Sequence, residues 1–262
     1  MLTSEDFLGR FSQTQRMSPS LNSVVKISEV RLSCSHCSLL ELCLPRGLIQ
    51  AELKDLEAAV DQQPPVNKSQ YLYRSGDQFT SFYAVKAGTF KTVFTSFDGE
   101  EQIVGFHLPG ELIGLDGLNT KRHTCDCIAL ERSSVCELPS SRMEELCRRY
   151  SSLNGAMHSI IGKTISEDQS MLLLLARRSA EERLASFFLS LSQRSQLRGT
   201  SCDEFSLPMS MRDIANYLGL APETLSRLIK KFEKNKVTRI DKRRITIACH
   251  NKLQSMIAEC KT

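Results

Sequence analysis

The sequence lacks the features that mark membrane and secreted proteins. Its longest uninterrupted apolar run, Met171–Ala176, is far shorter than the roughly 20 apolar residues that a membrane-spanning helix requires. The first ten residues carry acids and contain no basic stretch followed by an apolar core, so they do not predict a secretory signal. We therefore expect no membrane segment and, by default, a location in the cytoplasm.

The sequence also lacks the short motifs of most enzymes. It contains no G-x-G-x-x-G fingerprint for a nicotinamide or flavin cofactor, and no acid/base or nucleophile pattern beyond its cysteines. An enzyme is therefore not predicted. An iron–sulfur electron-transfer protein is the alternative that the cysteines leave open.

Basic charge is present but confined to one region. The length of 262 residues suggests two domains, and the net charge is only +4. Residues 212–244, however, hold ten Lys and Arg against four Asp and Glu, so this stretch carries +6 and the remainder −2. A basic region at one end of the chain favours a module that binds a polyanion.

Residues 71–138 have the pattern of an antiparallel β-domain. Short runs of Tyr, Phe, Val and Ile are separated by turn residues at roughly ten-residue spacing, which is typical of a β-sandwich or β-barrel. Asp98-Gly99 predicts a hairpin turn, because glycine adopts the positive φ that a tight turn needs. A short helix at residues 51–60, ended by Pro64-Pro65, is expected before this domain.

A long helix is expected at residues 151–178, where turn residues are few and apolar residues recur at helical intervals. Some of them are spaced alternately four and three residues apart, which predicts a coiled-coil seam and a homodimer. One member of the seam is an acid. The seam residues are Ile161, Ile165, Asp168, Leu172 and Leu175.

A helix-turn-helix is expected after a further helix at residues 180–197. Ser210 can cap a first helix, Gly219 permits the sharp turn, and a second helix begins near Pro222. This spacing is that of DNA-binding motifs, although other small helical proteins also contain such turns. A final β-hairpin follows, with basic residues at its tip.

The second helix carries side chains that can recognise DNA bases. Glu223, Ser226 and Arg227 share one face of its first two turns. Arginine can bind guanine with two hydrogen bonds, glutamate can accept from cytosine, and serine can bond to either kind of base edge. We expect phosphate contacts from Lys230 and Lys231 further along the helix, whereas Lys234 and Lys236 fit an ordinary solvated basic face.

Three of the ten cysteines form a compact motif. Cys34, Cys37 and Cys43 have the spacing C-x2-C-x5-C, which can place three thiolates around one metal centre and leaves a fourth ligand to be found. Spacing alone does not choose between zinc and an iron–sulfur cluster. The candidates for the fourth ligand are Cys125, Cys127, Cys136 and Cys147, whereas Cys202, Cys249 and Cys260 are expected to be bystanders.

From Cys34 to Ile247 the chain resembles the fumarate and nitrate reduction regulator (FNR) branch of the cyclic-AMP receptor protein superfamily. The motifs that carry the resemblance are CSHCSLLELC, GEEQIVGFHLPGELIG, SVCELP, EDQSMLLLL, AEERLASF and IANYLGLAPETLSRL. The resemblance implies an α+β fold. Its expected segments are a flexible arm at residues 1–33, a β jelly-roll sensor domain at 34–150, a dimerisation helix at 151–178 and a winged helix-turn-helix domain at 179–262.

The resemblance also implies a cofactor and an effector. It selects one oxygen-labile 4Fe-4S cluster per subunit over zinc, and it selects Cys136, through SVCELP, as the fourth ligand beside Cys34, Cys37 and Cys43. Leu42, beside Cys43, would then shield the cluster from solvent and oxygen, and a simple packing role is the alternative. Cyclic nucleotide binding is not expected, because Gly114-Leu115 replaces the Gly-Glu of that site and no Arg-Ser pair lies near Cys125.

For the DNA-binding half, the resemblance implies that Glu223, Ser226 and Arg227 recognise a palindrome with TTGAT-like half-sites. It also implies activation or repression of transcription through contact with RNA polymerase, for which the turn at Phe97–Glu100 is a candidate. A regulator of the same fold that senses haem, nitric oxide or a small effector is the nearest alternative.

Asp168 suggests how the sensor and the dimer are linked. Two-fold symmetry would bring two carboxylates together, and like charges about 4 Å apart repel by roughly 4 kcal/mol at an effective dielectric constant near 20. We hypothesise that an intact cluster packs against the long helix and offsets this repulsion. If Asp168 instead faces solvent at the edge of the seam, it contributes little.

Overall fold

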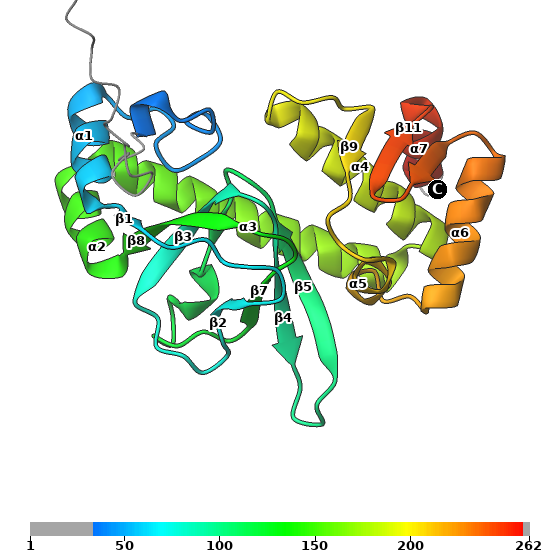
Figure 1. Cartoon of the computed structure of the whole chain (residues 1–262), viewed down its shortest axis with the longest axis horizontal. Coiled ribbons are helices and arrows are strands. Elements are labelled where there is room, and N and C mark those ends of the chain that lie inside the picture. The colour runs from blue at the N-terminus through cyan, green and yellow to red at the C-terminus, as the bar shows by residue number, and fades with distance from the viewer. Residues whose placement is uncertain (1–33, 259–262) are drawn as a thin grey trace, which may run out of the picture. The chain divides into compact units, whose positions relative to one another are not determined.

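The computed structural model describes residues 34–258, so the expected arm at residues 1–33 and the side chain of Cys260 lie outside the described residues. The described chain combines helices and sheets in the expected order: a β-sandwich, a long helix, and a C-terminal domain of helices with a small sheet (Figure 1). No helix among residues 34–258 is both long and apolar enough to cross a membrane.

The segment before the sandwich holds the cysteine motif and one helix. A short 3-10 helix, η2, spans Cys34–His36, and α1 spans Gln50–Ala59, one residue earlier than expected. The apolar side of α1 is buried through Leu53, Leu56 and Ala59, because these residues recur at helical spacing.

The β-sandwich consists of two four-stranded antiparallel sheets, with strand orders β1-β8-β3-β6 and β2-β7-β4-β5. Side chains alternate between the interior and the surface, so Val85, Phe90 and Val135 fill the space between the sheets. Gly88 turns the chain between β3 and β4 with φ +80°, and a Cβ there would collide with Ser133. The strands are β1 Asp61–Gln62, β2 Tyr71–Tyr73, β3 Ser81–Ala87, β4 Phe90–Thr95, β5 Glu101–His107, β6 Leu112–Ile113, β7 Asp126–Ala129 and β8 Ser134–Pro139, with a 3-10 helix, η3, at Leu115–Gly117.

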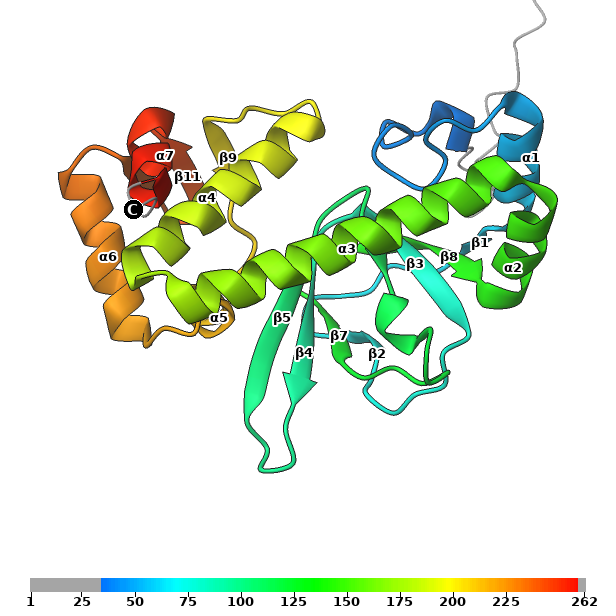
Figure 2. The ribbon, with the colours of Figure 1, turned by 180° about the vertical axis from the view of Figure 1, so that it is seen from behind.

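Three helices follow the sandwich. Helix α2 spans Ser140–Arg149, α3 spans Ser151–Arg177 as one continuous helix (Figure 2), and α4 spans Ala180–Leu197. Residues Leu153 and Met157 of α3 are buried beneath α2 and the first sheet. Helix α4 begins with a capping box in which Ser179 Oγ accepts from the Glu182 amide.

The C-terminal domain has a three-stranded sheet of order β10-β11-β9 beside its helices. Its core is formed by Leu184, Phe188, Leu218, Phe232 and Ile245, all at most 1 % exposed. The elements are β9 Glu204–Ser206, α5 Met211–Tyr217, α6 Pro222–Lys234, β10 Thr238–Asp241, β11 Arg244–Ile247 and α7 His250–Ala258.

Candidate functional site

The structure brings four cysteines from two distant segments to one pocket. Cys34, Cys37 and Cys43 come from η2 and the turns that follow it, and Cys136 comes from the middle of β8, where it pairs with Ala84 of β3. The rest of the pocket wall, as far as residues 34–258 form it, is apolar apart from Lys86. The other lining residues are Leu39, Leu40, Leu44, Pro45, Leu56, Val60, Ala84, Val85 and Leu138.

The thiols of the pocket affect one another's pKa values. Burial, followed by the neighbouring Cys136, Glu57 and Cys37, raises the pKa of Cys34 to about 11, while Lys86 acts in the opposite direction. Burial likewise raises the pKa of Cys43 to about 12, with a further contribution from Cys136. Several thiolates in one apolar pocket are unstable without a positive partner, so this donor set suits a metal centre.

The four pocket sulfurs are not all as close together as four ligands of one zinc ion. Four sulfurs on one tetrahedral zinc lie about 3.8 Å from each other. Among the described residues, Cys202, Asp203 and His250 form the group whose metal-ligating atoms all lie within 4.8 Å of one another. The four pocket cysteines do not form such a group.

The other fourth-ligand candidates lie elsewhere. Cys125 and Cys127 are buried in the part of the sandwich around Tyr73 and Asp116, and Cys147 is half-buried on α2. Leu42 is half-buried and packs over Gly110, whose missing side chain leaves room for it. His36 is exposed, with Nδ1 3.2 Å from Ser35 Oγ.

The interior of the sandwich contains a polar group centred on Asp116. Its Oδ2 accepts from the backbone amides of Thr124 at 2.9 Å and Cys125 at 3.2 Å, and its Oδ1 accepts from the Tyr73 hydroxyl at 3.2 Å. Burial alone would raise the pKa of Asp116, but hydrogen bonds from His123 and these amides lower it. The backbone amides of Thr124 and Cys125 therefore already donate their hydrogen bonds to a carboxylate of the chain itself, that of Asp116.

The helix-turn-helix has the expected caps. Ser210 Oγ accepts from the Asp213 amide at 3.1 Å, and the Ser210 amide donates to Asp213 Oδ2 at 3.0 Å. Gly219 adopts φ +61° in the turn, and Pro222 is the first residue of α6. These features confirm the expected motif.

Helix α6 presents the expected base-reading side chains to solvent. Glu223, Ser226 and Arg227 are exposed, and so is Lys230, while Leu225 and Phe232 on the opposite side are buried. Lys231 differs from Lys230, because its ammonium forms an ion pair with Glu181 of α4. The hairpin β10–β11 places Lys242 at its tip with φ 54°.

The seam residues on α3 do not all have the same surroundings. Ile165 and Leu172 are 52 % and 68 % exposed, and Asp168 between them is exposed. Ile161 and Leu175 are half-buried, and Leu175 lies beside Gly219 of the helix-turn-helix. Partial desolvation raises the pKa of Asp168 above its ordinary value.

Comparisons with known proteins agree with this architecture. Residues 65–150 match the family model of the cyclic nucleotide-binding domain, and residues 182–256 match that of the Crp-like helix-turn-helix domain. The chain is 44% identical over 204 residues to the transcriptional activator protein Anr of Pseudomonas protegens, covering 78% of this chain and 84% of Anr. The chain belongs to the FNR branch of the cyclic-AMP receptor protein family of transcription regulators.

A further relative and a solved structure each match most of the chain. The fumarate and nitrate reduction regulatory protein of Vibrio cholerae is 38% identical over 230 residues, or 88% of this chain and 92% of that protein. The solved structure of FixK2 from Bradyrhizobium japonicum superposes with a TM-score of 0.69 at 26% identity, covering 75% of this chain and 96% of FixK2.

Sequence patterns missed two features that bear on an FNR-type regulator. Lys86 of β3 lines the cysteine pocket. No sequence motif predicts this position, because it depends on how β3 pairs with β8 in the sheet. Cys202, expected to be a bystander, lies beside Asp203 and His250, which is 48 residues away from Cys202 in the numbering.

Proposed function

We propose that the protein is an oxygen-responsive transcription regulator that binds palindromic DNA as a homodimer when it carries one 4Fe-4S cluster per subunit. The observation that carries this proposal is the pocket in which Cys34, Cys37, Cys43 and Cys136 meet. Membership in the FNR branch supports the choice of iron, and two relatives are named anaerobic regulatory proteins. When bound, the cluster supplies an oxygen-labile link between η2 and β8.

The pocket residues hold and shield this link. The four cysteines supply thiolate ligands, and the leucines and proline around them exclude water. Lys86 is the one cation among the described residues of the wall and partly offsets the negative charge of the thiolates. Nothing in this arrangement calls for catalysis, so we propose no enzymatic activity.

Helix α1 connects the cysteine segment to α3 through hydrogen bonds. The Ser35 amide donates to Glu57 Oε1 at 2.8 Å, and Ser152 Oγ of α3 donates to Glu52 Oε1 at 2.6 Å. The pocket residues Leu44 and Leu56 also belong to the apolar cluster that contains Met157 of α3. A change in the order of residues 34–43 can therefore reach α3 through packed contacts.

Helix α3 is the dimerisation element in this proposal. The exposed Ile165 and Leu172 would be buried against a second copy, and the two Asp168 carboxylates would then approach each other. Repulsion makes such a dimer marginal, so the loss of anchoring at the cysteine pocket can shift the protein toward the monomer.

In the dimer, each α6 would enter the major groove at one half-site of a TTGAT-like palindrome. Glu223, Ser226 and Arg227 would contact base edges, and Lys230 would contact phosphate. A regulator that acts on DNA in this way works in the cytoplasm, beside RNA polymerase. The fully exposed Phe97 on the β4–β5 turn is our candidate contact for the polymerase.

The test is a DNA-binding measurement on protein purified without oxygen, before and after exposure to air. Iron and sulfide assays together with absorption spectra on the same samples separate a 4Fe-4S cluster from haem or zinc. We expect about four iron and four sulfide per chain, and a large loss of affinity in air. Equal binding in both states would overturn the sensing function, and an absence of iron and sulfide would overturn the cofactor.

A further inference from the structure

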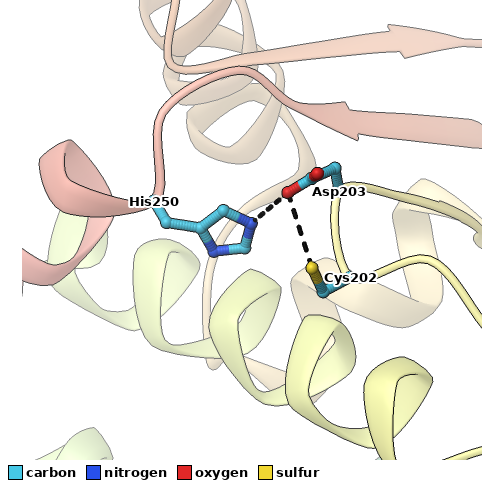
Figure 3. A group of neighbouring side chains, drawn as sticks. All are labelled: Cys202, Asp203 and His250. Atoms are coloured by element: carbon cyan, nitrogen blue, oxygen red, sulfur yellow. Dashed lines mark hydrogen bonds and ion pairs between the residues drawn. The ribbon is translucent and has the colours of Figure 1, made fainter. Parts of the chain in front are cut away.

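We propose that Cys202, Asp203 and His250 form a second metal site, in the DNA-binding domain, which takes Zn²⁺ or a similar divalent cation. The three side chains point toward one another from two segments of the chain (Figure 3). Asp203 Oδ1 lies 2.8 Å from His250 Nε2 and 3.6 Å from Cys202 Sγ. The site is separate from the cysteine pocket and does not depend on the proposed cluster.

The geometry is close to what one zinc ion requires. Thiolate, imidazole and carboxylate are the common ligands of zinc, and on a tetrahedral ion their ligand atoms lie about 3.3–3.8 Å from each other. The three ligand atoms here all lie within 4.8 Å of one another, so small side-chain rotations would bring them into place. A water molecule would complete the tetrahedron.

Charge and accessibility also suit a divalent cation. On binding, the Cys202 thiol releases its proton to solvent, and one thiolate and one carboxylate then neutralise the two positive charges of Zn²⁺. The side chains of Asp203 and His250 are 62 % and 31 % exposed, so an ion can enter from solvent. A simple ion pair between Asp203 and His250 would account for those two side chains, but it would not account for the thiol of Cys202 beside them.

The backbone beneath the ligands is already held in position. Ser192 Oγ of α4 donates to the Cys202 carbonyl at 2.7 Å, and the Ile247 amide of β11 donates to the Asp203 carbonyl at 2.7 Å. Ser192 is 4 % exposed, so the first of these bonds is protected from water. Two ligands on a fixed backbone lose little conformational entropy when a metal binds.

A metal at this site would connect the three-stranded sheet β10-β11-β9, here called the wing sheet, to helices α7 and α4. Asp203 directly precedes β9, the third strand of the wing sheet, and His250 is the first residue of α7, which packs on α4. An ion bound to both residues would fix the edge of the sheet that supports the β10–β11 hairpin. Zinc would therefore reduce local opening of the wing sheet.

The first test is a Co²⁺ titration of the full-length protein under anaerobic conditions, followed by competition with Zn²⁺. The variants Cys202→Ser and His250→Gln keep all four cysteines of the pocket, so any metal bound in that pocket is common to every sample. Cys249→Ser is the matched control, because it removes the neighbouring thiol and leaves the three proposed ligands. We expect the wild type and the control to bind one more Co²⁺, with thiolate charge-transfer absorption, than either ligand variant.

For that extra ion, loss of one ligand should weaken binding by at least about 100-fold, a larger effect than loss of a supporting contact. Equal stoichiometry and equal spectra in all four proteins would overturn the site. Hydrogen exchange is the second readout and does not need a variant. Zn²⁺ should slow exchange at residues 203–206 and 250–253, and unchanged exchange in the zinc-saturated protein would overturn the link to the wing.

Discussion

The rings of Tyr73 and His123 stack inside the β-sandwich, with centroids 3.6 Å apart and planes inclined by 12°. Both side chains also approach Asp116 Oδ1 to 3.2 Å, and the other carboxylate oxygen accepts from two backbone amides. This group lies in the region that matches the cyclic nucleotide-binding domain. The chain itself thus supplies an anion to the amides of Thr124 and Cys125.

We expect cyclic AMP to leave the thermal stability of the protein unchanged. A ligand that bound the folded state would add about 2.7 kcal/mol at 100 times its Kd, which raises Tm by several degrees. Differential scanning calorimetry with and without the nucleotide measures this, and a clear rise in Tm would contradict the prediction.

Asp116→Ala should lower the free energy of unfolding by about 2–3 kcal/mol, because it leaves buried donors without an acceptor. The exposed Asp98→Ala is the control.

Replacing Cys136 should remove the proposed cluster, whereas replacing Cys125 should not. Cys136 lines the pocket with the three N-terminal cysteines, but Cys125 lies among Thr124 and Asp116 in the sandwich. We expect anaerobically purified Cys136→Ser to contain little iron and sulfide and to bind DNA weakly. Cys125→Ser should match the wild type in both assays. The opposite pattern of iron content would show that the fourth ligand is misassigned.

Substitutions on α6 should separate base recognition from phosphate binding. Arg227→Ala should weaken binding to the specific site by about 1–3 kcal/mol and relax base preference at one position. Lys230→Ala should weaken binding to all sequences and reduce the salt slope by about 1. Lys231→Ala should have a smaller effect, because Glu181 already pairs with this ammonium. Fluorescence anisotropy at several salt concentrations measures all three, and equal salt slopes for Lys230→Ala and wild type would exclude the phosphate contact.

Asp168→Ala should dimerise in air. The substitution removes the proposed repulsion between two carboxylates on the seam, so the dimer no longer needs the cysteine pocket to be ordered. Glu167→Ala is the matched control, because it removes a neighbouring acid that pairs with Lys163 on the same helix. Sedimentation of aerobic samples distinguishes the variants. A monomeric Asp168→Ala protein would show that the repulsion is not what limits dimerisation.

The stability of the protein should fall in mild acid because of His107. The pKa of His107 is lowered from 6.5 to about 4, mainly by burial, with Glu111 opposing the shift and Arg194 adding to it. Below pH 6.5 the imidazole of His107 takes up a proton in the unfolded chain but stays neutral in the folded protein. The contribution of His107 to the free energy of unfolding is therefore complete above pH 6.5 and decreases as the pH falls toward 4. The loss amounts to at most about 3 kcal/mol. Urea unfolding at several pH values should show a weaker pH dependence for His107→Gln than for wild type or the exposed His158→Gln.

Local patterns in the sequence were sufficient for the elements and for parts of the site. The caps at Ser210 and Pro222, the helix of residues 180–197 and the strands of the sandwich all follow from spacing and residue type, which are properties of neighbouring residues. For the same reason, the motif of Cys34, Cys37 and Cys43 was recognisable. The exposed face of Glu223, Ser226 and Arg227 followed from helical periodicity.

Only the tertiary structure decided which distant residues meet. The sheet places Cys136 and Lys86 at the cysteine pocket, the ion pair with Glu181 distinguishes Lys231 from Lys230, and the start of α7 brings His250 to Cys202 and Asp203. The seam on α3 is similar, because periodicity predicts five equivalent residues while packing within the chain half-buries Ile161 and Leu175. Spacing along the chain reports contacts within one element, whereas these contacts depend on how separate elements pack.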